Sequence, residues 1–386
     1  MIPTDRSRIE TFQRCPRLYY HEYDYRTVGV SLGDAEHLDI GSSTHEGIAA
    51  VLLAVRDGLP LSHPDVLQIE LNGARNAPEY AGLSPEAREL TEALVLTWHA
   101  AILPKLDGWQ ILEVEREERF EYEGVVLLSR LDLLATPTRT VRLGSRNIEA
   151  GGLYNWNWKT AKRIDDRWRE SWLYAMQPLT ELLGPEQRLG RKLAGFLAGG
   201  LVKENHPLVW AWRSSKDGGL ALRRWWKCYE AHENTHTKRG GLCSGGKTHR
   251  LGDEYEAVRV SEVVEGGMAA QYQRILNEDP LLLAEFAEVV GPLSRRSDYE
   301  IERWCRQNLL PAKERAAVRE ETPLSDDVLD RWYPQHTARN NCMQPWPCAA
   351  KEICWGARSP EEFPWRKSNH PAEADCWAAR DLGKVV

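Results

Sequence analysis

The sequence has no apolar run that approaches the roughly 18 residues of a membrane-spanning helix. Its opening residues, MIPTDRSRIETF, contain no apolar segment of the kind that signal peptides carry. Both absences predict a cytoplasmic protein without membrane segments. An excess of basic charge is absent too, because 50 Lys and Arg stand against 57 Asp and Glu. A nucleic-acid partner would therefore have to be bound by a local basic groove.

The composition is otherwise that of a globular protein, with 42% hydrophobic and 28% charged residues. A chain of 386 residues holds either two average domains or one elaborated domain. Its 16 Trp are unusually many, and we expect most of them in the core and a few to stack on bases. Eight Cys in a reducing compartment argue against a disulfide framework.

One stretch, residues 127–162, carries the strongest chemical pattern. It reads as a strand LLSRLDLLAT with Asp132 in an apolar run, then a loop, then a second strand ending YNWNWKTAK. Asn157 and Lys159 are two apart, so both side chains leave the same strand face. An acidic side chain beside a polar-x-Lys pair suits a phosphodiesterase site. The carboxylate holds Mg²⁺ or Mn²⁺, and the Lys acts on the attacking water or on the phosphate charge. An ordinary hairpin with an edge Lys is the alternative.

Two further segments offer candidate ligands. Residues 38–55 predict a helix opened by Gly-Ser-Ser-Thr, with His45 in its first turn. There an imidazole binds a metal, or the helix N-terminus meets a phosphate; a buried structural His is the equal alternative. In the predicted strand WQILEVEREERFEY, Glu113 and Glu115 fall on one face and would supply a further carboxylate, unless that face is simply solvated.

The cysteines are unevenly placed. Cys15 stands alone near the start, and by itself it reads as a buried small hydrophobe. Arg14 and Arg17 flank it and could face phosphate. Near the other end, three Cys separated by five residues each form a soft-ligand cluster that is one thiolate short of four: Cys342, Cys348 and Cys354. We expect a metal or iron–sulfur site there.

The remaining segments give the order of the elements. Residues 56–108 predict a helical insertion over the sheet. Residues 109–204 predict three strands, a helix and a further strand, an order typical of an α/β protein with a mixed sheet. Residues 205–265 form a basic, Gly- and His-rich insertion. Residues 266–332 predict helices, including the segment PLLLAEFAEVVGPL.

Two patterns in the basic insertion are weaker. Gly241 to Thr248 spell the P-loop pattern, but no apolar strand precedes it and no helix follows, so we treat it as a chance match. Four potential zinc ligands have no familiar spacing: Cys228, His232, His236 and Cys243.

Taken together, these motifs resemble the RecB-type branch of the PD-(D/E)XK nuclease superfamily, and within it the iron–sulfur members. The opening pattern S-x-x-x-x-F-x-x-C-P-R-x-Y-Y runs without a gap from Ser7 to Tyr20. The remaining motifs follow in the family's order: Gly41 to His45, Asp132 in SRLDLL, Asn157 to Thr160, Tyr174 to Gln177, and one N-terminal with three C-terminal Cys. Single motifs are weak, but their joint order is specific.

The resemblance implies a restriction-endonuclease-like α/β core, a mixed sheet flanked by helices, in a single elaborated nuclease domain over residues 1–386 with its catalytic core in 109–204. It implies a metal-dependent DNA exonuclease that acts on single strands or ends in recombination, repair or phage DNA processing. The implied Mg²⁺ or Mn²⁺ ligands are His45, Asp132, Asn157 and the backbone carbonyl of Trp158. The implied catalytic residues are Asp132, Asn157 and Lys159.

The resemblance also implies a [4Fe–4S] cluster on Cys15 and the C-terminal trio, with residues 336–358 as the iron–sulfur segment that joins the two chain ends. Tyr174 and Gln177 would contact DNA. The sequence has no credible helicase motif, so unwinding would need a helicase or recombination partner, and oligomeric assembly stays open.

Two positions depart from the family. Asn157 stands where the family has Asp or Glu, and an amide oxygen without charge binds a divalent cation weakly. A deliberate inactivating Asp-to-Asn change, a compensating carboxylate such as Glu113 or Glu115, or a natural non-cleaving protein would each explain it. The retained Asp132 and Lys159 favour the first. Glu181 stands where a Tyr is expected after Gln177.

Two alternatives to a nuclease follow. A DNA-binding or assembly protein that keeps the fold without cleavage is favoured by Asn157. A scaffold in which the four thiolates bind Zn²⁺ is the weaker one, and its protein would be colourless, whereas an iron–sulfur protein is brown.

Overall fold

A computed structural model of the chain describes residues 2–25, 29–32, 36–215, 218–222, 255–319, 326–334, 348–354 and 357–365. Cys342, the P-loop-like run and the four potential zinc ligands of the basic insertion lie outside these residues. Among the described helices, none has the length and apolarity needed to cross a membrane.

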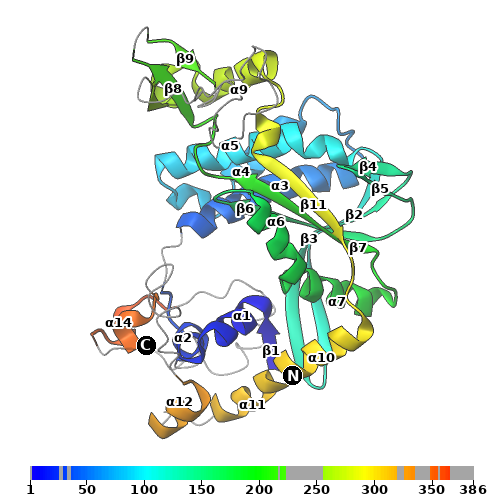
Figure 1. Ribbon diagram of the computed structural model, residues 1–386, viewed down its shortest axis with the longest axis vertical. Helices are drawn as coiled ribbons and strands as arrows, with labels where there is room; N and C mark the ends of the chain where they lie inside the picture. The colour runs from blue at the N-terminus through cyan, green and yellow to red at the C-terminus, as the bar shows by residue number, and fades with distance from the viewer. Residues whose placement is uncertain are drawn as a thin grey trace, which may run out of the picture.

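A six-stranded mixed sheet forms the centre of the molecule (Figure 1). Its strands are β1 (Ile2–Asp5), β2 (Trp109–Tyr122), β3 (Val125–Pro137), β6 (Tyr154–Ala161), β7 (Gly195–Val202) and β11 (Ala287–Leu293). The order is β1-β3-β6-β7-β11, and β2 pairs with β3. β1 and β7 run parallel to their neighbours β3 and β6, whereas β2 and β11 are antiparallel to theirs. The predicted mixed sheet is confirmed.

The hairpin of β2 and β3 follows from the sequence. Apolar residues partly alternate along β2 and are nearly continuous along β3, which is buried over most of its length, and a two-residue turn joins the strands. Glu123 and Gly124 both have positive φ, of 46° and 86°. This conformation is typical of the tight turns whose twist matches that of the flanking strands.

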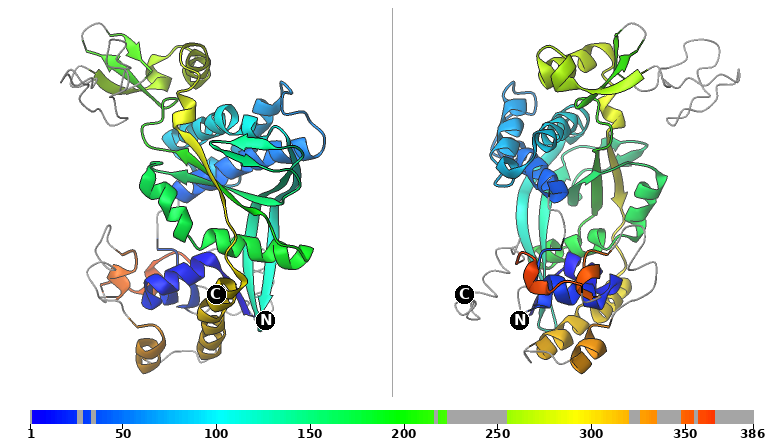
Figure 2. Two further views of the ribbon diagram at one scale, coloured as in Figure 1. Left: turned by 45° about the vertical axis from the view of Figure 1, so that its right-hand side comes forward. Right: turned by 90° about the vertical axis from the view of Figure 1, so that its left-hand side faces the viewer.

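Helices cover both faces of the sheet. On one face lie α3 (Glu36–Arg56), α4 (Val66–Arg75) and α5 (Pro85–Ala101), and on the other α6 (Asp166–Tyr174) and α7 (Gln177–Leu189) (Figures 1 and 2). Trp98 of α5 packs edge-on against Trp158 of β6, with ring centroids 5.6 Å apart, and both rings are fully buried. The Trp-rich second strand is therefore a core strand, and its tryptophans stabilise the contact between sheet and helices.

The two ends of the described chain meet in a helical lobe beside β1 (Figure 1). It contains α1 (Arg6–Arg14), α2 (Pro16–Tyr19), the π-helix η1 (Tyr20–Asp24), α10 (Asp298–Asn308), α11 (Leu310–Arg319), α12 (Asp326–Trp332) and α14 (Lys351–Cys354). Tyr19 and Tyr23 pack with Tyr333, whose hydroxyl donates to Asp24 over 2.8 Å. Pro16 restarts the helix after Cys15, as its lack of an N–H requires.

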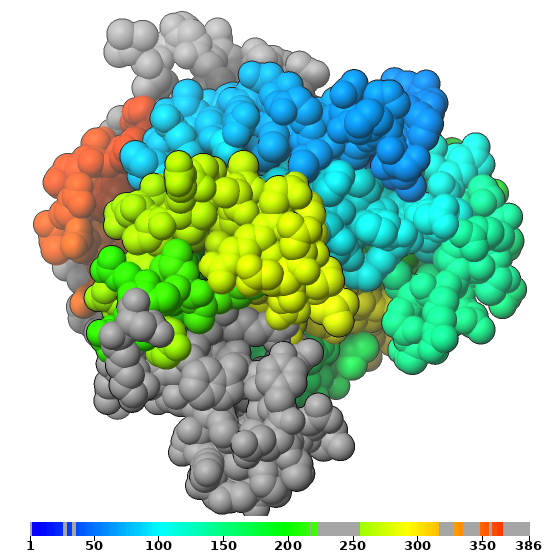
Figure 3. Space-filling model, turned by 90° about the horizontal axis from the view of Figure 1, so that it is seen from above, coloured from blue at the N-terminus to red at the C-terminus, as the bar shows by residue number. Residues whose placement is uncertain are grey.

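A smaller segment packs against the outer side of α5 (Figure 3). It contains β8 (Trp210–Ser214), β9 (Leu220–Ala221), β10 (Tyr255–Arg259), α8 (Val260–Val263), α9 (Gly267–Glu278) and η5 (Leu283–Glu285). Leu208, Tyr272 and Leu283 pack there with Ala93 and Leu96 of α5. The remaining elements are β4 (Val141–Leu143), β5 (Arg146–Ile148), η3 (Tyr80–Gly82), η4 (Leu103–Leu106) and η6 (Pro360–Glu362).

Two expectations about elements are wrong. The segment PLLLAEFAEVVGPL forms the short helix η5 and then strand β11, because Val289 and Val290 favour extended backbone and Gly291-Pro292 cannot continue a helix. Helix α3 begins at Glu36, so His45 lies in its interior and not in its first turn. The helix N-terminus therefore does not bring a phosphate to His45.

Candidate active site

The candidate site occupies an interruption in the sheet. β1 pairs with β3 up to Leu128, and β6 pairs with the same edge of β3 from Leu133 onward. β2 occupies the other edge over the whole length. Asp132 thus sits where β1 has ended and β6 has diverged from β3. A cavity of about 290 Å³ opens there.

The cavity is lined by residues from seven elements, which span the chain from β1 to α7. They are Asp5, Arg6, Ser7, His45, Glu117, Leu128, Ser129, Arg130, Asp132, Asn157, Lys159, Thr180 and Glu181. Four residues of the predicted site are among them, namely His45, Asp132, Asn157 and Lys159. The prediction that Asn157 and Lys159 share a strand face agrees with this, because both line the cavity whereas Trp158 points into the core.

Asp132 is the most firmly held carboxylate of the cavity. Its Oδ2 accepts a hydrogen bond of 2.7 Å from the backbone N–H of Trp158 on β6. This interaction, together with the positive charges of His45 and Lys159, keeps the pKa of Asp132 below its usual value although burial opposes the shift. The carboxylate is therefore ionised at neutral pH.

His45 of helix α3 lies next to Asp132 and Glu115. Its Nδ1 lies 3.5 Å from Asp132 Oδ2 and 3.8 Å from Glu115 Oε1. Ligand atoms of these three side chains all lie within 4.8 Å of one another. Imidazole and carboxylate groups are suitable ligands for Mn²⁺ or Mg²⁺. These residues fit a divalent cation.

Glu115 reaches this position through an unusual backbone conformation. Its φ is +48°, a region that non-glycine residues rarely adopt and that is typical of functional sites. The expected common face of Glu113 and Glu115 is wrong for this reason. Glu115 turns toward His45, whereas Glu113 accepts a hydrogen bond of 2.5 Å from Arg188 on α7.

The electrostatics of the trio favour a positive charge. Burial would lower the pKa of His45, but Asp132 and Glu115 raise it to about 9. Burial raises the pKa of Glu115, and His45 opposes that shift. Two carboxylates around one imidazole thus stabilise a cation at this point, either a proton or a metal ion.

A second group of side chains, buried at the other end of the cavity, surrounds Asn157. Its Nδ2 donates to Glu181 Oε2 over 3.2 Å, and its Oδ1 accepts from Gln177 Nε2 over 2.8 Å. Gln177 Nε2 also lies 2.6 Å from Glu181 Oε1. Burial raises the pKa of Glu181 to about 7, against the opposing effect of Lys159. Asn157, Gln177 and Glu181 form one network, which we call the amide–carboxyl network.

Three charged residues of the cavity that were not predicted as site residues can contribute to its chemistry, namely Arg130, Arg6 and Glu181. Arg130 pairs with Glu115 over 2.9 Å and is half exposed, and Arg6 pairs with Glu10 over 3.2 Å. Both arginines line the cavity and can meet a phosphate. The sequence marks Glu181 only as a departure from the family, although its position four residues after Gln177 places both on one helix face.

The predicted DNA-contacting residues are dispersed. Tyr174 is 83% exposed at the end of α6, and Arg14 is exposed on α1. Arg17 instead donates to Asp330 and to the carbonyl of Tyr333, over 2.6 and 2.8 Å. Gln177 is buried in the amide–carboxyl network, so its amide is already bonded within the protein.

Three of the four predicted cluster cysteines converge. Cys15, Cys348 and Cys354 pack in one small hydrophobic cluster with Leu18 and Ala350. Cys342 lies outside the described residues. The convergence joins residues that are more than 300 positions apart, and it agrees with the expectation that the cysteines bring the chain ends together.

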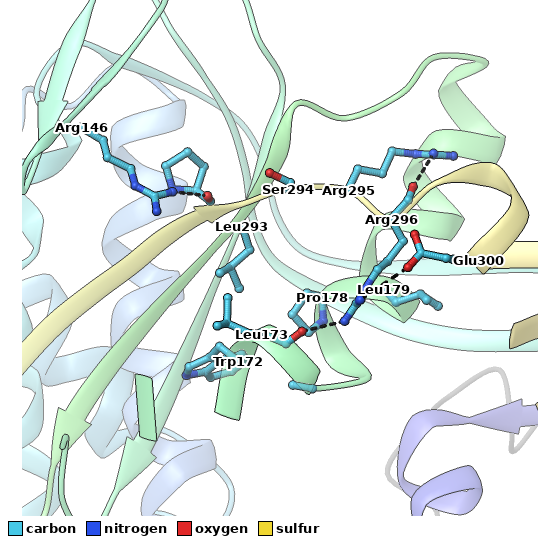
Figure 4. Close-up of a pocket in the computed structure, with 12 residues that line it drawn as sticks. Arg146, Trp172, Leu173, Pro178, Leu179, Leu293, Ser294, Arg295, Arg296 and Glu300 are labelled. Atoms are coloured by element: carbon cyan, nitrogen blue, oxygen red, sulfur yellow. Dashed lines mark hydrogen bonds and ion pairs between the residues drawn. The ribbon is translucent and has the colours of Figure 1, made fainter. Parts of the chain in front are cut away.

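A second cavity, of about 350 Å³, lies beside the turn between α6 and α7 (Figure 4). Arg296 donates to the carbonyl of Leu173 over 2.6 Å, and Arg146 donates to the carbonyl of Pro292 over 2.9 Å. Both guanidinium groups thus bind backbone carbonyls. Arg296 holds the end of α6, and Arg146 of β5 holds the end of β11.

Comparison with protein families finds a match of residues 6–143 to the PD-(D/E)XK nuclease superfamily. Comparison with curated proteins finds no match. The matched region contains His45, Glu115 and Asp132, whereas Asn157, Lys159 and Glu181 lie beyond it. The mixed sheet with helices on both faces agrees with the restriction-endonuclease-like core of that superfamily.

Proposed function

We propose, from this similarity to PD-(D/E)XK nucleases, that the protein is a Mg²⁺- or Mn²⁺-dependent deoxyribonuclease. The observation that carries the proposal is the meeting of His45, Glu115 and Asp132 within 4.8 Å. His45 and Asp132 line the same cavity as Lys159. A carboxylate–imidazole group beside a Lys can hold a divalent cation and stabilise charge on a phosphate, which suits metal-assisted phosphodiester hydrolysis.

The roles of the side chains follow from their positions. His45, Glu115 and Asp132 would hold the cation, with the backbone carbonyl of Trp158 as the further ligand that the family resemblance implies. When bound, the cation polarises the phosphodiester and lowers the pKa of a water molecule. The bond from the Trp158 N–H fixes Asp132 in one orientation. Lys159 stabilises the negative charge that develops on the phosphate, or orients the water.

DNA is the substrate class that the proposal names, with single strands or ends preferred, and the proposed reaction is exonucleolytic. Arg6 and Arg130 at the cavity would contact the backbone, and Arg14 and Tyr174 lie exposed for further contacts. These local cations fit a protein whose net charge is −7. We further propose that the protein acts in recombination, repair or phage DNA processing. Its location would be the cytoplasm, and a helicase would be its partner.

The proposal includes a [4Fe–4S] cluster on Cys15, Cys342, Cys348 and Cys354. Packing of three of these cysteines in one cluster supports it. Cluster binding would join residues 336–358 to α2 and so stabilise the helical lobe. In this arrangement residues 1–386 form one elaborated domain around the core of residues 109–204, with residues 56–108 and 205–265 as insertions.

A second candidate function is DNA binding without cleavage, and Asn157 is the observation that favours it. Asn157 in place of an acid removes a negative charge from the site, either by a deliberate Asp-to-Asn change or by nature.

The test is Mn²⁺-dependent digestion of end-labelled single- and double-stranded DNA by the full chain, purified anaerobically, beside Asn157→Asp. A covalently closed circular DNA of the same sequence serves as the matched substrate without ends. Cleavage of linear DNA alone supports an exonuclease. Cleavage of circles would contradict the exonuclease proposal and leave the nuclease proposal standing.

If only Asn157→Asp cuts, the protein is a nuclease whose present form is disabled. If neither form cuts and both bind DNA, the binding protein replaces the nuclease as the function.

A further inference from the structure

We propose that Glu181 of helix α7 supplies the carboxylate that Asn157 lacks on strand β6, with Asn157 and Gln177 as its positioning residues. The inference rests on the proposed function, since it adds a cation ligand to the same site. By this inference, the chain with Asn157 is an active nuclease.

The first argument is the orientation of the Asn157 amide. Its NH₂ group faces Glu181 Oε2 at 3.2 Å, and its oxygen accepts from Gln177 at 2.8 Å. A rotated amide would place two oxygens against each other at Glu181. In this arrangement Gln177 occupies one lone pair of the Asn157 oxygen, and the Asn157 NH₂ group holds the carboxylate of Glu181 in place. The uncharged oxygen of Asn157 is by itself a weak ligand for a divalent cation.

The second argument is the remaining capacity of Glu181. The carboxylate is 6% exposed and lines the cavity with Asp132 and Lys159. Each of its oxygens accepts one bond, from Asn157 or from Gln177. Because an ionised carboxylate offers about four lone pairs, about two remain for a cation. A second buried acid facing Asp132 is costly unless a positive charge lies between them.

The third argument is the rigidity of the helix that carries Glu181. Arg188 donates to both oxygens of the buried Glu118 on β2, over 3.0 and 3.1 Å from its Nε. Arg295 donates to Glu186 over 2.8 Å. The turn before α7 is held by the bond from Arg296 to Leu173 (Figure 4). The contacts of Arg188 and Glu186 hold α7 itself, and the contact of Leu173 holds the end of the preceding helix α6. A fixed support of this kind is what a metal ligand needs.

Glu113 and Glu115 are weaker candidates for this role. Glu113 pairs with Arg188 and Arg116 away from the cavity. Glu115 belongs to the His45 group and pairs with Arg130. Of the three, Glu181 is the carboxylate that Asn157 itself contacts.

The experiment tests whether the carboxylate is needed at Glu181 on helix α7 or can be supplied at position 157 on strand β6. Mn²⁺ binding to the full chain is measured from the electron paramagnetic resonance signal of the free ion, together with DNA digestion. The variants are Glu181→Gln, Asn157→Asp, the two changes together, and Glu170→Gln as the control. Glu170 is exposed on the neighbouring helix α6 and does not line the cavity, so the control removes the same charge without touching the site.

We expect Glu181→Gln to weaken Mn²⁺ binding about tenfold or more and to abolish cleavage, because lost ligand contacts cost at least that much affinity. The double variant should recover binding to within about threefold of the parent, since its carboxylate returns to the strand. Glu170→Gln should bind Mn²⁺ like the parent.

The inference fails if Glu181→Gln binds Mn²⁺ and cuts like the parent, and the proposed function then survives. It also fails if the parent is inert while Asn157→Asp cuts. If the parent, Asn157→Asp and the double variant neither bind Mn²⁺ nor cut, the proposed function fails together with the inference.

Discussion

The backbone N–H of Trp158 donates to the carboxylate of Asp132 over 2.7 Å, at the point where β3 and β6 cease to pair. A buried N–H at such a point needs a partner. Asp132 therefore has two tasks, since it satisfies the backbone of β6 and lines the cavity beside His45. The end of the pairing between β3 and β6 thus leaves the Trp158 N–H for Asp132, and this bond also sets the position of the proposed metal ligand.

Replacement of Asp132 by Asn should separate these two tasks. The amide oxygen of the variant still accepts from the Trp158 N–H, so the melting temperature should stay close to that of the parent. The lost charge should weaken Mn²⁺ binding about tenfold or more and abolish DNA digestion. Asp132→Leu, which also leaves the N–H unpaired, should cost a further 1–3 kcal/mol of unfolding free energy, roughly. Full cleavage by Asp132→Asn would contradict the assignment.

Binding of Mn²⁺ should depend on pH through His45. Its pKa is raised to about 9, so the imidazole must lose a proton before it can bind the ion. We expect the affinity to rise, by at most about tenfold per pH unit, as the pH approaches about 9. Calorimetric titrations in buffers of different ionisation enthalpy would detect the released proton. His45→Asn should remove this pH dependence, and an unchanged pH profile in that variant would refute it.

The same raised pKa has a consequence for the cation-free protein. The protonated imidazole stabilises the fold fully below the unfolded pKa of about 6.5. That contribution is lost as the pH rises through about 9. Denaturant unfolding of the parent in chelator should therefore show stability falling over this interval, and His45→Asn should show less of the decline.

Substitution of Gly199 should disturb the site from a distance. Gly199 on β7 pairs with Trp158, and a Cβ at this position would overlap the indole ring. Gly199→Ala should cost about 1–3 kcal/mol of unfolding free energy, as overpacking does, and should impair Mn²⁺ binding through Trp158 and Asp132. Gly82→Ala is the control, because a Cβ added there would meet no atom within 4 Å and the φ of Gly82 is not positive. Equal stability of both variants would contradict this.

The cysteine cluster predicts a coloured protein. Protein purified anaerobically should be brown, and Cys15→Ser or Cys348→Ser should lose both the visible absorption and much of the stability. Cys305→Ser is the matched control, because Cys305 belongs to α10 and is buried in a different hydrophobic cluster. A colourless protein that contains zinc would replace the iron–sulfur centre by the zinc alternative.

The sequence by itself determined the parts that depend on local pattern. Strand-like segments in the sequence predicted β2, β3 and β6, and the two-residue spacing of Asn157 and Lys159 predicted their shared strand face. Each of these is fixed by steric or hydrogen-bonding rules that act over a few residues.

Only the tertiary structure decided how the site is assembled. The positive φ of Glu115 separates it from Glu113, the edge pairing of β11 overrides an apolar run that also fits a helix, and Glu181 meets Asn157 through the packing of α7. These outcomes depend on contacts between residues far apart in the chain, where burial and pairing outweigh local propensity. Comparison of the sequence with the family pattern therefore indicated that an acid is missing at Asn157, and the fold showed that the carboxylate of Glu181 lies beside it.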